Sequence, residues 1–342
     1  MIASFYLKNY RLFQELYINS FERINVIVGM NNVGKSSLLE AIHLYLRKQA
    51  LAGTLYQQSQ ARNEWIPKDF KPQNILNCLR SVFYGRKVVS DDQERPNVIY
   101  LGVSEQAGVS FYLKKIHPDY AEDQQMLVIE DHAQKKEIPL SEYEKYLSIP
   151  VSPHVMMVSA HRPMKYFNTL SQKWGRIALT EKEPFVIEAL QLIDEQIEGV
   201  AFIDEGRRKK GIVKLRGLAR PVSLGSMGEG VMRILRTILA LVRCENGTLL
   251  IDEVETGLHW SVQAKLWKVM CQLAHKLNIR IFVTTHSRDT IGALQQVAFA
   301  DGYAEDIRVL KLKFSPKTRR IKPAEFEIGN VKLALEQGIE IR

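Results

Sequence analysis

The chain has 342 residues, of which 46% are hydrophobic and 25% are charged, and this is enough to bury a sizeable core. No apolar run is long enough to cross a bilayer, and the first residues lack the apolar segment of a signal peptide, so we expect a cytoplasmic protein without a membrane partner. The net charge of +9 favours polyanionic partners. The three cysteines are far apart, which argues against a disulfide framework or a paired-cysteine zinc site.

The first fifty residues predict two strands, a third strand, a loop and a helix. We expect short strands over residues 4–7 and 16–18, and a buried strand over Ile24–Val28 because its apolar residues are all β-branched. A loop then leads into a helix over residues 36–47, where leucine and isoleucine recur at helical spacing.

The loop between that strand and helix, GMNNVGKS, matches the phosphate-binding pattern G-x-x-x-x-G-K-[ST]. Glycines let several N–H groups face one point, and the following helix adds its positive N-terminal end. We expect Lys35 to reach the β- and γ-phosphates of ATP and Ser36 to ligate Mg²⁺. The alternative, a glycine-rich turn that only caps a helix, is disfavoured by the strand before the loop. The predicted nucleotide-binding residues are Gly29, Asn31, Asn32, Val33, Gly34, Lys35, Ser36 and Ser37.

The remaining elements predict an α/β protein, because buried strands alternate with helices in the last third. The middle of the chain predicts antiparallel strands at 98–103, 109–114 and 126–129, a short helix at 140–147, a strand at 155–159 followed by the turn AHRP, a helix at 182–196, and a hairpin with strands at 200–203 and 213–215 around a turn at 205–211. The last third predicts helices at Glu229–Arg243 and 261–276, buried strands at Thr248–Ile251 and Arg280–Thr284, and a tail that forms a small sheet and a final helix.

Three motifs in the last third carry chemistry. A buried strand delivers Asp252 and Glu253 at its C-terminal end, where we expect Asp252 to hold Mg²⁺ and Glu253 to accept a proton from the attacking water. The alternative for these acids is a solvated turn. The segment SLGSMGEG, residues 223–230, indicates either a second anion site or an ordinary helix cap with flexible glycines; in isolation the cap is favoured, but the position just before the acidic strand favours the anion site. The strand IFVTTHS ends at His286, which either senses the γ-phosphate or is a structural histidine.

In this order the motifs resemble the ABC ATPase superfamily, in particular its RecF/SMC/OLD-like branch and the stand-alone AAA family ATP-binding proteins. The resemblance rests on LKNYRLF and INVIVGMNNVGKSSLLEAI near the start, and on SMGEG, LLIDEVETGLHW and VTTHS in the last third. It covers residues 1–48 and 220–295 strongly and residues 50–220 loosely. The sequence shows neither the long coiled coil of SMC proteins nor the TOPRIM domain of OLD nucleases.

The resemblance implies roles for particular residues. It implies that Arg11 reaches the nucleotide phosphates, that Ser226 and Gly228 contact a γ-phosphate held by a second subunit, and that residues 255–259 form a loop across the dimer interface. His286 matches the switch histidine, and the implied cofactors are ATP and Mg²⁺. A phosphate-sensing glutamine can be placed by position alone, at Gln57, Gln58 or Gln60.

The expected fold is an α/β, ABC-type P-loop NTPase domain with a mixed β-sheet core, an antiparallel β subdomain and a helical insert. We expect one domain over residues 1–342. Its nucleotide-binding core is formed by residues 1–50 and 220–300, its inserted subdomain by residues 51–219, and its C-terminal extension by residues 301–342.

Two basic clusters bear on nucleic acid binding. One is the run RRKK at residues 207–210, and the other is formed by six cations between residues 311 and 322. Such clusters can grip phosphate backbones, although they are also common on solvated hairpins. Aromatic residues do not alternate with these cations, so double-stranded DNA is the candidate partner rather than a single strand.

The expected function is an ATPase that dimerises head to tail around ATP, with Lys35, Glu253 and His286 as catalytic residues. By analogy with the family, it controls a separately encoded effector such as a nuclease in antiviral defence. The alternatives are an ATP-gated scaffold with negligible hydrolysis and a RecF-like DNA repair clamp. A transporter subunit is disfavoured because the signature segment is non-standard and the insert is long.

Overall fold

The computed structural model describes residues 2–64, 70–89, 96–116, 125–147, 154–159, 167–206 and 208–331. The chain divides into two units. Unit 1 comprises residues 1–21, 27–152 and 310–325, and unit 2 comprises residues 22–26, 153–309 and 326–342. The predicted AHRP turn and most of the predicted final helix lie outside the described residues. Within the described part of the chain, no helix is long and apolar enough to span a membrane.

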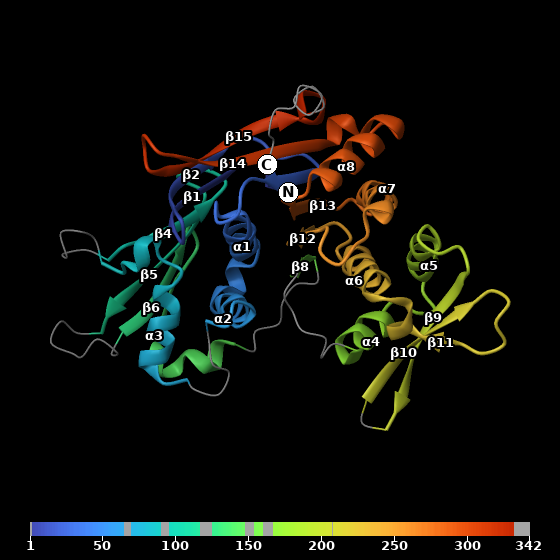
Figure 1. The fold of residues 1–342 in the computed structure, drawn as a ribbon. Coiled ribbons are helices and arrows are strands. Elements are labelled where there is room, and N and C mark those ends of the chain that lie inside the picture. The colour runs from blue at the N-terminus through green and yellow to red at the C-terminus, as the bar shows by residue number, and fades with distance from the viewer. Residues whose placement is uncertain are drawn as a thin grey trace. The chain divides into compact units, whose positions relative to one another are not determined.

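Unit 1 contains an antiparallel sheet in the order β2-β1-β4-β5-β6-β7 (Figure 1). Its strands are β1 (Phe5–Tyr10), β2 (Phe13–Ile18), β4 (Ile99–Gly102), β5 (Gly108–Lys115), β6 (Gln125–Asp131) and β7 (Lys135–Pro139). Strand residues alternate between its faces, so Phe5 and Leu7 are buried whereas Lys8 is exposed. Phe5 packs edge-to-face on Tyr45 of helix α1 (Lys35–Leu46), with ring centroids 5.9 Å apart, so α1 covers the buried face.

In unit 1, the helix after the P-loop is α1, and further helices and 3-10 turns come after it along the chain. These helices and short 3-10 turns are α1, η1 (Lys48–Ala50), α2 (Leu51–Ala61), α3 (Pro72–Arg80), η2 (Tyr84–Arg86) and η3 (Leu140–Tyr146). No element is predicted from sequence between residues 50 and 97, because α2 buries polar residues where a helical pattern would show apolar ones. Thr54 and Gln58 of α2 are buried and donate to the main-chain oxygens of Ala50 and Glu40.

Unit 2 is built on buried parallel strands. Strand β12 (Thr248–Ile251) lies between β8 (Val155–Val158) and β13 (Arg280–Thr284), with Thr248 opposite both Val155 and Arg280. The start of β3 (Ile24–Val28) lies beside β13, where the Asn25 Nδ2 donates to the Ile281 carbonyl at 3.3 Å. Because parallel strands end at the same edge, the residues after β12 and β13 come close together.

The remaining elements of unit 2 are helices and a small antiparallel sheet in the order β11-β10-β9. The helices and 3-10 turns are α4 (Phe167–Gly175), α5 (Glu183–Gln191), η4 (Leu224–Met227), α6 (Glu229–Arg243), α7 (Trp260–Lys276), α8 (Arg288–Ala300) and η5 (Ala304–Asp306). The strands are β9 (Ile197–Glu205), β10 (Arg208–Leu215) and β11 (Val222–Ser223). Two strands with residues in both units follow, β14 (Ile307–Ser315) and β15 (Arg320–Glu327).

Four predicted elements have the observed bounds: Ile24–Val28, Glu229–Arg243, Thr248–Ile251 and Arg280–Thr284. Two predictions in the middle of the chain are wrong in extent. Helix α5 ends at Gln191 rather than at residue 196, and the turn predicted at 205–211 is much shorter because β10 begins at Arg208. Cross-strand ion pairs extend the hairpin, since Lys209 Nζ lies 2.9 Å from Asp204 and Lys210 Nζ lies 2.9 Å from Glu205.

Candidate nucleotide site

The P-loop forms a closed turn between β3 and α1 in unit 1. Gly34 has a φ of 89° and caps the N-terminus of α1, and Lys35 is the first residue of the helix. The Lys35 ammonium turns back and donates to the carbonyls of Gly29 and Met30, each at 2.8 Å. The cation is thereby held over the loop, where a phosphate group would replace these two carbonyls as its partner.

The loop needs both of its terminal glycines. A Cβ on Gly34 would lie 2.7 Å from the Phe13 ring, and a Cβ on Gly29 would lie 2.6 Å from the Leu312 carbonyl oxygen, so neither position has room for a side chain. Both residues also have positive φ angles, which glycine adopts without strain. The sequence pattern therefore corresponds to a steric requirement of unit 1.

The other predicted P-loop residues differ in exposure. Asn31 and Asn32 are exposed, whereas Val33 and Ser37 are buried and Ser36 is half-buried. The Ser37 hydroxyl lies 3.5 Å from Arg62 Nη2 at the end of α2. Ser37 therefore contributes to packing below the loop, while Ser36 lies nearer to solvent.

Arg11 lies in a buried ion-pair cluster. Its Nε lies 3.1 Å from Glu40 of α1 and its Nη1 lies 3.2 Å from Glu64, in the turn after α2. Burial opposes the charge of Arg11, but its interactions with Tyr10, Glu40 and Glu64 outweigh burial and raise the pKa. The structure thus places the Arg11 guanidinium on two carboxylates, whereas the family resemblance assigns it to phosphates.

The three candidate glutamines lie on α2, so they form part of a helix rather than a loop. The buried Gln58 donates to the Glu40 carbonyl at 3.0 Å. Gln57 accepts from Arg47 at 3.1 Å, and Gln60 donates to the Tyr56 hydroxyl at 2.7 Å. In unit 1 these side chains join α2 to α1 and to itself.

In unit 2, Asp252 and Glu253 follow β12 and are held by Thr284 at the end of β13. The Thr284 hydroxyl donates to Asp252 Oδ1 at 2.6 Å and accepts from the Glu253 amide at 2.8 Å. Asp252 is buried, and its amide donates to the Val158 carbonyl of β8 at 2.9 Å. The neighbouring strands therefore fix both acids, which were predicted from β12 alone.

Glu253 has a left-handed backbone, with a φ of 48°, although it is not a glycine. Its carboxylate accepts from the Thr256 hydroxyl at 3.1 Å. Its carbonyl accepts from the buried guanidinium of Arg233 on α6, and the same Nη2 donates to the Asp252 carbonyl at 3.1 Å. Left-handed non-glycine residues held by their surroundings concentrate at functional sites.

Arg233 is a residue that the sequence interpretation missed. Burial and the neighbouring Arg236 lower its pKa, and its Nε has no hydrogen-bond partner among the described residues. A signal was available, because Arg233 falls on the buried side of a helix rich in leucine and isoleucine, where a charge needs a specific partner.

His286 lies at the end of β13 and is paired with Glu255. The His286 amide donates to Glu255 Oε1 at 2.9 Å, and its Nδ1 lies 3.1 Å from the same oxygen. The imidazole is half exposed, whereas the Glu255 carboxylate is largely buried. Unit 2 thus brings His286 next to the segment 255–259, as expected for residues after adjacent parallel strands.

The signature segment also meets the segment 255–259. The Ser226 hydroxyl donates to the Ser223 carbonyl at 2.6 Å, which closes the turn before α6, and Gly228 caps α6 with a φ of 87°. A Cβ on Gly230 would lie 3.4 Å from the Gly257 carbonyl oxygen. Ser226, Gly228 and Gly257 are all exposed, so this part of unit 2 presents a polar surface with few side chains.

Comparisons with known proteins agree with these motifs. A family model described as "AAA domain, putative AbiEii toxin, Type IV TA system" matches residues 83–291, and one described as "AAA ATPase domain" matches residues 1–150. An "ATP/GTP phosphatase" of Helicobacter pylori is 24% identical over 350 residues, covering 92% of each chain. A "DNA replication and repair protein RecF" of Protochlamydia amoebophila is 29% identical over 93 residues, covering 26% of each chain.

A solved structure supports the fold. The crystal structure of an SMC head bound to the C-winged helix domain of ScpA has a TM-score of 0.55 at 10% identity, covering 96% of this chain and 99% of that chain. The predicted fold class, a mixed α/β P-loop fold, is therefore confirmed. Because the first family model spans more than half of the chain, the chain belongs to the family described as "AAA domain, putative AbiEii toxin, Type IV TA system".

Proposed function

We propose that the chain binds ATP through residues 29–37 and hydrolyses it with Glu253. The loop supplies the anion site, since Lys35 is already held at the N-terminus of α1 by two carbonyls that a phosphate would displace. Along the chain, residues 51–219 separate the P-loop from Asp252 and Glu253, and we propose that they are an insert in one ATPase domain.

The donor atoms suit Mg²⁺. The Ser36 hydroxyl and the Asp252 carboxylate are hard oxygen ligands, and Mg²⁺ in nucleotide sites typically takes one or two protein oxygens together with phosphate oxygens and water. Thr284 orients Asp252 by donating to its Oδ1. When bound, the ion would neutralise charge on the phosphates, and these two residues would hold it.

The backbone of Glu253 is the observation that carries the hydrolysis proposal. The amide is held by Thr284 and the carbonyl by Arg233, so the residue keeps a positive φ that would otherwise cost free energy. This fixes the direction of the carboxylate next to Asp252. A carboxylate in that place is suited to take a proton from the water that attacks the γ-phosphate.

We further propose that the site is completed by a second copy of the chain. Ser226 and Gly228 are exposed and share a surface with Gly257, which suits contact with another subunit. An N-terminal helix end without a side-chain cap, such as that of α6, can bind the γ-phosphate held by the partner. ATP would then clamp two subunits together until hydrolysis releases them.

The output of this cycle is proposed from analogy with the family. The family description names a putative toxin of a toxin–antitoxin system. We therefore propose that the chain controls a separately encoded effector in antiviral defence. Toxicity of the chain itself is the alternative. The RecF relative favours a DNA-linked output. The name of the Helicobacter relative makes GTP a second nucleotide to test.

A mixing experiment tests the shared site. Ser226→Arg and Glu253→Gln should each abolish steady-state phosphate release from ATP. In an equimolar mixture, the Glu253 of one chain can face the intact Ser226 of the other, so we expect partial recovery of turnover. If no mixing ratio restores any activity, each chain hydrolyses ATP alone and the dimer proposal is wrong.

A further inference from the structure

The two basic clusters of the sequence differ in how their charges are used. In the β9–β10 hairpin of unit 2, Lys209 and Lys210 pair with Asp204 and Glu205, and farther along β10 Lys214 pairs with Glu198 at 3.1 Å. These pairs neutralise much of the hairpin, so it offers little attraction to a polyanion. Arg207 lies outside the described residues.

The second cluster, which lies on β14, β15 and the turn between them in unit 1, is less fully paired, although Arg320 pairs with Glu15. Four of its cations, Lys313, Lys317, Arg319 and Lys322, are exposed, and in the described part of the chain none makes an ion pair or hydrogen bond through its side chain. We call these four residues the β14–β15 cations. Unpaired like charges repel one another and so lower the stability of the fold, but they attract an anionic partner.

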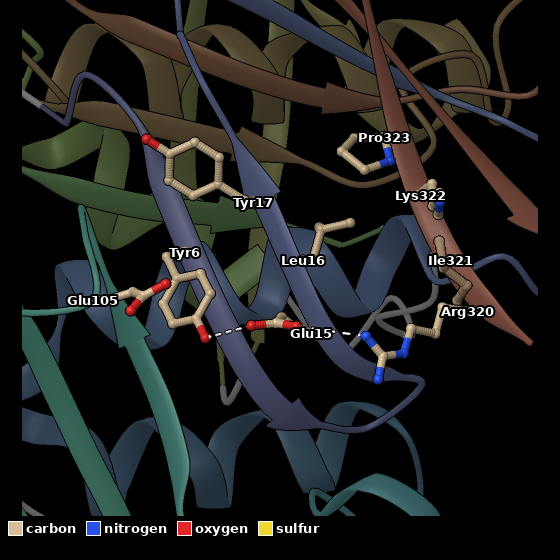
Figure 2. Close-up of a pocket in the computed structure, with 9 residues that line it drawn as sticks. All are labelled: Tyr6, Glu15, Leu16, Tyr17, Glu105, Arg320, Ile321, Lys322 and Pro323. Atoms are coloured by element: carbon tan, nitrogen blue, oxygen red, sulfur yellow. Dashed lines mark hydrogen bonds and ion pairs between the residues drawn. The ribbon is translucent and has the colours of Figure 1, made fainter. Parts of the chain in front are cut away.

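A pocket of about 330 Å³ adjoins this patch (Figure 2). Its lining includes Tyr6, Glu15, Tyr17, Glu105, Arg320 and Lys322. Figure 2 shows Glu15 between the Tyr6 hydroxyl, at 2.8 Å, and Arg320, at 3.6 Å, so its charge is already compensated. The Tyr17 ring is 47% exposed and lies 6.4 Å from the Tyr6 ring, centroid to centroid.

We propose that this surface binds single-stranded nucleic acid, with phosphates on the β14–β15 cations and a base on Tyr17. An exposed tyrosine beside cations is the combination that recognises single strands, because any base can stack on the ring. Glu105 at the pocket can accept hydrogen bonds from base amino groups. The sequence disfavoured a single strand because no aromatic residue alternates with the cations. The structure places Tyr17 of β2 and Lys322 of β15 in the lining of the same pocket.

The test is fluorescence anisotropy with a labelled oligothymidylate and the full chain, over a series of salt concentrations. Lys317→Gln/Arg319→Gln/Lys322→Gln should weaken binding about tenfold or more and should reduce the salt slope by about 2, since each single-strand phosphate contact contributes about 0.7. The matched control is Lys209→Gln/Lys210→Gln, which removes paired cations and should leave the affinity within about twofold.

A second variant separates stacking from charge. Tyr17→Ala should weaken binding about fivefold or more without changing the salt slope, and Tyr17→Phe should restore it. Equal loss in the control, tighter binding to a duplex of the same length, or binding only to phosphatidylserine vesicles would each overturn the proposal. ATP turnover without DNA should be unchanged in all variants, so this result stands or falls separately from the proposed hydrolysis.

Discussion

The guanidinium of Arg233 donates to the main-chain carbonyl of Glu253, and through the same nitrogen to that of Asp252. Arg233 lies on α6, five residues after Gly228, the signature-segment glycine that caps the N-terminus of this helix. The contact therefore joins the signature helix to the acidic turn within one subunit. It gives α6 a direct means to set the position of Glu253, since any movement of the helix would change the support of that backbone.

We expect Arg233→Met to lower kcat by about tenfold to a hundredfold, because a small displacement of a catalytic carboxylate is costly. The KM for ATP should change much less, since the P-loop lies in unit 1. Arg233→Lys keeps the charge with fewer donors and should recover part of the activity. Steady-state kinetics, together with thermal unfolding to confirm the fold, measure both effects. A loss confined to KM would show that Arg233 does not position Glu253.

Glu253→Gln should bind ATP normally but turn over about a hundredfold to ten-thousandfold more slowly, because the amide cannot accept the proton from water. The variant should accumulate as an ATP-bound dimer, detectable by light scattering after size exclusion. Thr256→Ala is a useful comparison, since it removes the hydroxyl that donates to the Glu253 carboxylate at 3.1 Å but leaves that carboxylate in place, so its effect should be smaller. Turnover in Glu253→Gln near that of the unaltered chain would exclude Glu253 as the base.

The sequence predicts the motif residues because each depends on local spacing. The pattern GMNNVGKS by itself predicts a phosphate-binding loop. Asp252 and Glu253 follow a strand whose apolar residues by themselves predict that it is buried. Helical spacing could mark Arg233 as buried but could not show its partners, since these depend on how α6 packs near the end of β12. The same holds for Arg11, whose partners Glu40 and Glu64 lie on distant segments of unit 1. Tertiary contacts between charged groups leave no periodic signal, so sequence reasoning assigns such residues by analogy.

Gly34→Ala should abolish ATP binding and lower stability. The new methyl group would lie 2.7 Å from the Phe13 ring, and the residue must keep a φ of 89°. The cost is about 1–3 kcal/mol from backbone strain alone. Lys35→Ala should also lose binding, but without the steric clash. The measurement is the rise in unfolding temperature with Mg-ATP, which at about a hundredfold excess over Kd corresponds to about 2.7 kcal/mol in the unaltered chain. A normal rise in either variant would exclude the P-loop as the binding site.

The buried cysteine thiols lead us to expect that the folded chain loses stability at alkaline pH. Burial raises the pKa of Cys244 and of Cys271 to about 12, and that of Cys78 to about 11, from an ordinary value near 9. Below pH 9 the thiols are protonated in both the folded and the unfolded chain, so they have no effect on stability. Between pH 9 and about 11 the unfolded chain releases these protons while the folded chain largely retains them, so the free energy of unfolding should fall as the pH rises.

The same burial predicts that a thiol reagent reacts slowly. At pH 8 the three thiols are buried and protonated in the folded chain, so they should react with Ellman's reagent only as fast as the chain opens. Urea titrations at pH 8 and pH 10 measure the loss of stability, and the reagent measures access at pH 8. One thiol that reacts at once in the native chain would contradict the buried positions of Cys78, Cys244 and Cys271.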